Sequence, residues 1–307
     1  MMYLLKKWYF DCLTRKGEYA YVCFAYMALA GRTIRSLTLH VAAPGAIPVS
    51  RSFLIRSHSE AGADIAACAI GLPCGDIRVG ARDCSLFLAS DDCAVNLAFS
   101  NGNGEPDAPV QIVTGRKSRI VWRPVALRYD VNGEITLGGT RLEPRGASGY
   151  ADVLQSTCLP PLVPARTLYW GRAHHASFDM TYVHALTPRG ESVCSRLYVR
   201  TGNTALGGPL SFAPDGGGAG SSPGGYVIAG TAGECRLSAR VHHERPVQES
   251  SFVDQQDVPQ TLRGLMRLLT RDPRGTKYLA RAHVSLLLPG EERSVPGLAM
   301  IDECVRL

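Results

Sequence analysis

The chain has 307 residues, of which 45% are hydrophobic and 20% charged, and its formal net charge is +6 at pH 7. This composition is typical of a globular protein with one large or two medium-sized cores. The arginines are scattered rather than gathered into one tract, so the charge argues against a nucleic-acid partner and for a solvated basic surface. No stretch reaches the ~18 apolar residues that a membrane-spanning helix needs.

Ten cysteines occur without any Cys-x-x-Cys pair, and the nearest two, Cys68 and Cys74, are too irregularly placed for a common metal site. We therefore expect reduced thiols in the core, with a zinc site or a disulfide framework as the alternatives. Residues 1–10 are too short for a secretory leader, and the two lysines follow the apolar residues. We interpret this segment as the first strand of a cytoplasmic protein.

The first half of the chain has the pattern of short strands separated by turns. Aromatic and small residues alternate over 18–29, which is typical of a strand with one buried face. Asn101–Gly104 is expected to be a turn, and Asn132-Gly133 a type I′ hairpin turn because both residues tolerate positive φ. The predicted strands are 7–13, 18–29, 36–41, 51–56, 64–71, 77–80, 84–88, 93–99, 110–113, 119–129 and 134–138.

After a proline-rich joint at 159–164 the pattern restarts, and the layout of 169–200 resembles that of 8–41. We expect two similar β domains, 1–158 and 159–307, each an antiparallel barrel or sandwich. Residues 214–225 are too rich in glycine to pack. The predicted strands of the second half are 169–175, 178–186, 192–200, 226–229, 234–242, 279–288 and 298–306.

One segment has helical rather than strand periodicity. Apolar residues recur at helical spacing near 258–271, Asp257 is placed to cap the start, and Asp272-Pro273 ends the run. The arginines of this segment lie away from the apolar stripe. We predict a helix packed on the second barrel, with a membrane- or phosphate-binding helix as the alternative.

Asp152 is the sharpest candidate for chemistry. On a strand, Tyr150 and Asp152 point to one face, while Ala151 and Val153 point to the other. A carboxyl group held in an apolar cavity beside a phenol would have a raised pKa and could stay protonated near neutral pH, as a general acid must. The alternative is an aspartate that ends a strand by capping a turn or pairing with an arginine.

Trp170 and Arg172 share a face by the same periodicity, and an indole beside a guanidinium suits an unsaturated or carbonyl-bearing ligand. The alternative is a core tryptophan with the arginine extending to the rim. Adjacent histidines on a strand point to opposite faces, so His174-His175 and His242-His243 do not make a metal site. We expect no metal, and His175 is a candidate hydrogen-bond partner. No P-loop or dinucleotide-binding glycine motif occurs.

Three short motifs together resemble a known family: Lys-Trp-Tyr-Phe-Asp at 7–11, Gly-Tyr-Ala-Asp at 149–152 and Trp-Gly-Arg-Ala-His at 170–174. They are similar to the carotenoid 1,2-hydratase (hydroxyneurosporene synthase) and AttH-like group, which includes lipocalin-like cyclases and Diels–Alderases. Asp152 matches the acid of that group, and Trp170 and Arg172 match its aromatic–basic strand. The chain departs from the group at Leu154, which replaces an asparagine, and at Ser156, which replaces a glycine.

The resemblance implies a mainly β fold with two lipocalin-like barrels and a cofactor-free enzyme of lyase or isomerase type. Its substrate would be a hydrophobic polyene or isoprenoid-like molecule, which it would hydrate or cyclise, including by pericyclic chemistry. The departure at Leu154 favours cyclisation, because an apolar side chain admits less water. Two alternatives are a lipocalin-like carrier that does no chemistry and a β domain for protein interactions. The predicted catalytic residues are Asp152, Arg172 and Tyr150, and the predicted substrate-binding residues are Trp170, Tyr9, Tyr21, His175 and Tyr182.

Overall fold

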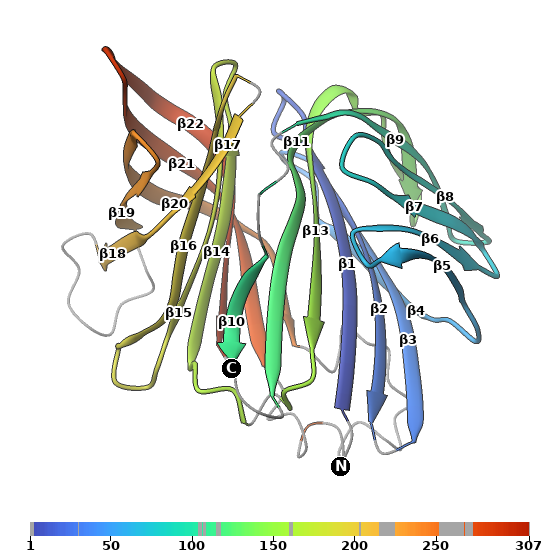
Figure 1. Ribbon diagram of the computed structural model, residues 1–307. Coiled ribbons are helices and arrows are strands. Elements are labelled where there is room, and N and C mark those ends of the chain that lie inside the picture. Colours follow the sequence, from blue (N-terminus) through green and yellow to red (C-terminus); the bar gives the residue numbers. More distant parts are fainter. Residues whose placement is uncertain are drawn as a thin grey trace. The chain divides into compact units, whose positions relative to one another are not determined.

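The described part of the protein is built almost entirely of strands (Figure 1). The computed structural model describes residues 3–29, 31–103, 106, 109–114, 118–159, 162–202, 204–214, 225–251, 267 and 273–306. Within these ranges the chain forms 22 strands in two antiparallel sheets. The strands of each sheet belong to a separate compact unit, so the two sheets are described one at a time.

The first sheet has thirteen strands in the order β4-β3-β2-β1-β13-β11-β9-β8-β7-β6-β5, with β10 and β12 paired to β11. It curls until β3 and β4 contact β11. Its strands are β1 (Tyr3–Leu13), β2 (Tyr19–Leu29), β3 (Arg32–Ala42), β4 (Val49–Leu54), β5 (Ser59–Asp64), β6 (Ala67–Leu72), β7 (Gly75–Val79), β8 (Cys84–Ser90), β9 (Cys93–Asn103), β10 (Val110–Thr114), β11 (Arg119–Leu137), β12 (Thr140–Leu142) and β13 (Arg145–Ser156).

The second sheet has nine strands in the order β17-β16-β15-β14-β22-β21-β20-β19-β18. Its two ends approach each other, because β16 and β17 contact β19. Its strands are β14 (Thr167–His174), β15 (Phe178–Leu186), β16 (Ser192–Thr201), β17 (Thr204–Gly208), β18 (Leu210–Pro214), β19 (Gly225–Ala232), β20 (Cys235–Ser251), β21 (Arg274–Leu288) and β22 (Glu291–Arg306).

The two sheets share a topology. In each one the first strand lies between the second strand and the last, since β1 pairs with β2 and β13, and β14 pairs with β15 and β22. The sequence similarity between 8–41 and 169–200 therefore corresponds to three strands with equivalent places in the two sheets. The expectation of a mainly β protein with two lipocalin-like antiparallel sheets is confirmed.

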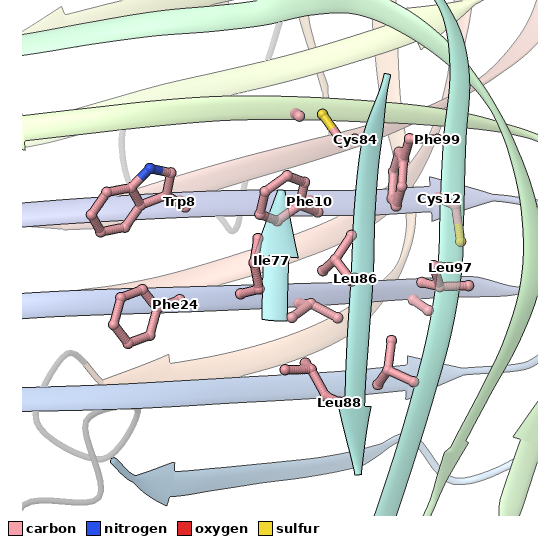
Figure 2. Close-up of a cluster of buried hydrophobic side chains, with 14 of the residues drawn as sticks. Trp8, Phe10, Cys12, Phe24, Ile77, Cys84, Leu86, Leu88, Leu97 and Phe99 are labelled. Carbon is pink, nitrogen blue, oxygen red and sulfur yellow. The ribbon is translucent and has the colours of Figure 1, made fainter. Parts of the chain in front are cut away.

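The core of the first sheet is formed by strands whose side chains alternate between buried and exposed. Strand β9 alternates between buried and exposed side chains over Cys93–Phe99, as a half-buried strand must. Its inward residues Leu97 and Phe99, with Leu86 of β8, pack against Trp8 and Phe10 of β1 (Figure 2). Figure 2 shows β8 and β9 crossing over β1 and β2, so the sheet is folded onto itself around these side chains.

Strands β1 and β2 differ from β9 because both of their faces are buried over most of their length. One face of β1 carries Trp8 and Phe10 and belongs to the hydrophobic core. The other face carries Tyr9 and Asp11, which are buried as well but do not belong to that cluster. Strand β1 therefore contributes to the hydrophobic core with one face and carries buried polar side chains on the other.

Three predictions about local structure are wrong. The expected turn at Asn101–Gly104 is not one over its described residues, because strand β9 continues through Asn103. Asn132-Gly133 is not a hairpin turn, because β11 runs through it with a register shift after Val131. The turn lies at Gly138-Gly139, where both residues have positive φ and connect β11 to β12. The predicted strand 64–71 is a hairpin, in which the Asp64 carboxylate accepts a hydrogen bond from the Ala66 N–H and reverses the chain between β5 and β6.

The predicted helix at 258–271 lies outside the described residues, apart from Arg267, which is helical. In the part of the chain that the structure describes, no helix is long and apolar enough to cross a membrane. The ten cysteines all fall in the described ranges, and their thiols form no disulfides. Seven of these side chains are buried and three are partly buried, which agrees with the expectation of core thiols.

Candidate active site

The candidate site of the first sheet lies on the face of β13, β1, β2 and β3 opposite to the hydrophobic core. Residues paired across antiparallel strands point to the same face, so the strand register places polar and aromatic side chains in two adjacent rows. One row is Asp152, Tyr9, Cys23 and Thr38, and the other is Tyr150, Asp11, Tyr21 and His40. The predicted residues Tyr150, Asp152, Tyr9 and Tyr21 thus lie together on one face.

Both carboxyl groups of this face are removed from water. Asp152 is 7% exposed and Asp11 is 1% exposed, and Tyr150 is fully buried. Asp152 sits opposite Tyr9 in the sheet, and Asp11 sits opposite Tyr150. Burial of a carboxyl group is costly unless it is hydrogen-bonded, paired or neutral, so two such groups side by side on one sheet are typical of a functional surface.

Aromatic rings surround these acids. The rings of Tyr9 and Tyr21 stack with centroids 5.5 Å apart, and Tyr21 stacks on His40 at 5.3 Å. The Tyr9 hydroxyl also bonds to the Tyr19 hydroxyl at 2.5 Å. The result is a rigid wall of π faces, which attracts positive charge and suits a flat, conjugated ligand.

Asp11 was not among the predicted site residues, although it is the last residue of the Lys-Trp-Tyr-Phe-Asp motif at 7–11. Alternation from Tyr9 places Asp11 on the same face, and this signal was available. The same alternation from Tyr21 places Tyr19 on this face, whereas His40 carried no comparable signal, because its contribution depends on how β3 pairs with β2. The glycine of the Gly-Tyr-Ala-Asp motif has a packing role, since a Cβ at Gly149 would lie 2.2 Å from Val131 Cγ2.

Trp170 and Arg172 lie together on β14 of the second sheet. The Arg172 guanidinium is 5.6 Å from the centroid of the Trp170 ring, and Lys277 Nζ is 5.7 Å from the same centroid. Lys277 is paired with Glu303, which neighbours Trp170 on β22. Arg172 is 1% exposed, so its side chain does not extend to the rim.

His174 and His175 make local contacts. His174 Nδ1 lies 3.0 Å from Asp179 Oδ1, and Asp179 is also paired with Arg200. His175 follows the end of β14, and its Nδ1 bonds to Ser177 Oγ at 2.9 Å within the turn to β15. Among the described residues there is no group of three or more histidine, cysteine or acidic side chains that could hold a metal ion.

Tyr182 points to the other face of the second sheet, away from Trp170 and Arg172, and enters its core. There it donates a hydrogen bond to Asp302 Oδ1 at 2.6 Å and contacts the hydroxyl of Tyr226. His243 Nε2 bonds to Asp302 Oδ2 at 2.6 Å. Burial, followed by the nearby Asp302 carboxylate, raises the pKa of Tyr182 and of Tyr226 well above the ordinary tyrosine value.

The residues that complete this second cluster were not predicted. His243 was considered only as a metal ligand, and Asp302 was not considered. Alternation along Met300, Asp302 and Cys304 places a lone acid on a face that otherwise enters the core. That pattern would have identified Asp302, but only the pairing of β20, β21 and β22 brings His243 to it.

Substitution of Gly171 by alanine should destabilise the protein by about 1–3 kcal/mol, because an added Cβ would lie 2.3 Å from the Tyr182 hydroxyl and force its ring away from Asp302. Chemical denaturation monitored by circular dichroism measures this loss. Gly275→Ala, on β21, is the matched control. A Cβ at Gly275 would lie 3.2 Å from its nearest neighbour, Glu303 Oε1, so this substitution should cost less stability. Equal stability of the two variants would contradict this role of Gly171.

Acidification should weaken the fold through His184, whose pKa is lowered by burial from its ordinary value of 6.5. Below that pH the unfolded chain binds a proton that the folded chain rejects, so the free energy of unfolding falls as the pH drops through 6.5. Denaturation curves at pH 7.5 and 5.5 should show a smaller decrease for His184→Phe than for the wild type. His242→Phe, at an exposed position, should keep the full decrease. Identical pH slopes in all three proteins would rule out this contribution.

A groove of about 610 Å³ lies elsewhere, on strands β18 to β22. Its lining includes Ser211, Ala229, Ser238 and Ser285, which follow one another across neighbouring strands. It is open and carries neither the Asp152 rows nor the Asp302 cluster. The titratable side chains that line it, Arg236 and Glu292, belong to neither of the buried clusters described above.

Comparison with models of known protein families finds no match. Comparison with curated proteins finds none either. Solved structures do match along nearly the whole chain. The crystal structure of CghA has a TM-score of 0.71 at 13% identity, covering 99% of this chain and 88% of that one.

Two further structures are similar. A protein from Nitrosomonas europaea assigned as AttH has a TM-score of 0.55 at 11% identity, covering 98% of this chain and 92% of that one. Kievitone hydratase from Nectria haematococca has a TM-score of 0.53 at 12% identity, covering 98% and 88%. The resemblance suggested by the three sequence motifs is confirmed at the level of the fold: the chain has the lipocalin-like architecture of CghA, AttH and kievitone hydratase.

Proposed function

We propose that the protein is an enzyme that acts on a hydrophobic, conjugated small molecule, with Asp152 as the acid. The observation that carries this proposal is the pair of buried acids, Asp11 and Asp152, on a sheet face otherwise formed largely by tyrosine rings. An acid beside π faces suits a reaction in which an alkene gains a proton and a positive charge develops on carbon.

The proposed step transfers the proton of the Asp152 carboxyl group to an alkene carbon. The O–H bond breaks, a C–H bond forms, and the neighbouring carbon becomes cationic. The rings of Tyr9 and Tyr21 would stabilise this cation. Capture by water gives hydration and capture by a second double bond gives cyclisation, and in both cases a proton returns to the Asp152 carboxylate. Neither route needs a cofactor.

For a carbonyl-bearing polyene, the same acid would instead donate a hydrogen bond to the carbonyl, and the tyrosine wall would hold the chain folded for a pericyclic closure. Two structural relatives support this range of chemistry. Kievitone hydratase is a hydratase by name, and CghA has been crystallised with Sch210972. The apolar Leu154, which follows Asp152 on the same face of β13, favours cyclisation over hydration.

The test is to incubate the purified protein with isoprenoid, carotenoid and polyketide-derived polyenes and to analyse the products by mass spectrometry. Hydration adds the mass of one water, whereas cyclisation yields an isomer with a changed ultraviolet spectrum. Heat-denatured protein is the control for spontaneous reaction. Binding of the polyenes without any product would favour the carrier alternative, and failure to bind any polyene would refute the proposal.

A further inference from the structure

The second sheet holds a directional chain of hydrogen bonds that the proposed function does not use. Asp302 is completely buried, as is Tyr182, and Tyr226 is nearly so. A carboxylate only accepts hydrogen bonds, so the single hydroxyl proton of Tyr182 goes to Asp302. The Tyr226 hydroxyl bonds to Tyr182 and also lies within hydrogen-bond reach of Asp302, so it donates its own proton toward the carboxylate, through Tyr182 or directly. Both tyrosine hydroxyl protons of this hydrogen-bond chain therefore point toward Asp302.

His243 closes the other end of this chain. Because the carboxylate cannot donate, the proton between His243 Nε2 and Asp302 Oδ2 belongs to the imidazole. The imidazole also stacks on Tyr278, with centroids 4.0 Å apart. Asp302 thus receives a hydrogen bond on each of its two oxygens, and its position is set from both sides. At the opposite end, the Tyr226 hydroxyl uses its proton as a donor within this chain of hydrogen bonds, so its oxygen can accept a hydrogen bond from a ligand.

A ring-shaped slot lies against Tyr226. The side chain of Phe212 occupies it, with centroid distances of 4.3 Å to Tyr226, 4.5 Å to Tyr169 and 4.9 Å to His184. Phe212 is only half-buried and belongs to β18, a five-residue strand that pairs with β19 alone among the described strands. An edge strand of this kind can move its side chain at low cost compared with a central strand.

We propose that this slot is a second ligand site, which takes a planar phenol or enol in place of Phe212 and removes its hydroxyl proton through Tyr226 and Tyr182 to Asp302. The ligand O–H proton moves to the Tyr226 oxygen, the Tyr226 proton to Tyr182, and the Tyr182 proton to Asp302 Oδ1. Three O–H bonds break and three form. The products are a ligand oxyanion and a neutral Asp302 carboxyl group, so charge and atoms balance.

The chemical selectivity follows from the direction of the hydrogen bonds. A ligand that donates a hydrogen bond satisfies the Tyr226 oxygen, whereas an ether or ketone places an acceptor against an acceptor. The three surrounding rings select a flat, conjugated ligand by stacking. This inference is independent of the proposed function, because its residues belong to the second sheet and Asp152 belongs to the first.

The probe is 4-nitrophenol, whose absorbance changes when it loses its proton, and 4-nitroanisole is the matched ligand without a donor. We expect the wild-type protein to bind 4-nitrophenol at least about fivefold more tightly than 4-nitroanisole, as one hydrogen bond allows. The bound phenol should show the phenolate spectrum at a pH at which the free probe is mostly neutral. Equal affinity for the two probes would overturn the proposal.

Three variants assign the steps. Tyr226→Phe should reduce the affinity for 4-nitrophenol to that for 4-nitroanisole, and Asp302→Asn should keep binding but lose the phenolate spectrum. Phe212→Ala should strengthen binding of both probes, whereas Phe87→Ala, which removes an exposed ring from the first sheet, should not. Thermal denaturation confirms that each variant is folded. No binding by either the wild type or Phe212→Ala, or unchanged behaviour of Tyr226→Phe, would refute the site, and neither result would affect the role proposed for Asp152.

Discussion

Under the proposed function, replacement of Asp152 by asparagine should lower kcat by about 10²- to 10⁴-fold on any substrate that the protein converts, while substrate binding is largely retained. The amide has nearly the shape of the carboxyl group but cannot deliver a proton to an alkene carbon. The position is 7% exposed and opposite Tyr9, so the side chain stays in place among the tyrosine rings. Steady-state kinetics and equilibrium binding on the same substrate separate the two effects.

Asp130→Asn is the matched control for this change. Asp130 lies on β11 of the same sheet, its side chain is 42% exposed, and it is 3.8 Å from Arg128. Its substitution should leave kcat within about twofold, because it touches neither row of the candidate site. A third variant, Asp11→Asn, shows which buried acid transfers the proton. If Asp152→Asn retained full turnover while Asp11→Asn lost it, the acid would be Asp11, and the role assigned to Asp152 would be wrong.

Removal of the Phe10 ring should destabilise the fold by about 3–5 kcal/mol, since Phe10→Ala deletes a large side chain from the buried core and leaves a cavity. Phe10 is 1% exposed, and its ring lies 5.9 Å from that of Phe99 in an edge-on contact. The two residues come from β1 and β9, so this contact holds opposite walls of the first sheet together (Figure 2). Urea denaturation followed by tryptophan fluorescence measures the change.

Phe87→Ala removes the same ring from β8, where the side chain is 54% exposed, and should cost less than about 1 kcal/mol. Both variants lose the same phenylalanine ring, so the difference between their free energies of unfolding reports the burial of Phe10. A similar loss in both variants would mean that Phe10 does not occupy the core. Because Tyr9 and Asp11 flank Phe10 on the opposite face, Phe10→Ala should also reduce activity through the position of β1.

Much of the candidate site was predictable because strand periodicity is a local property. The common face of Tyr150 and Asp152, and that of Trp170 and Arg172, follow from alternation along one strand. The same rule could have identified Asp11 and Asp302. Turns were less predictable: Asn132-Gly133 has the residues of a hairpin turn, but the long pairing of β11 with β9 and β13 carries the strand through it.

The amino-acid sequence alone determined that this protein is made of strands, in two similar sets, and which side chains of each strand lie on a common face. These features depend on neighbours one or two positions away, where sterics and alternation act directly. Only the tertiary structure decided which face becomes core and which residues meet across strands. Asp11 meets Tyr150, and Asp302 meets His243 and Tyr182, because strands far apart in the chain pair in one register. Such pairing is selected by packing of the whole sheet, and no short segment contains the information for it.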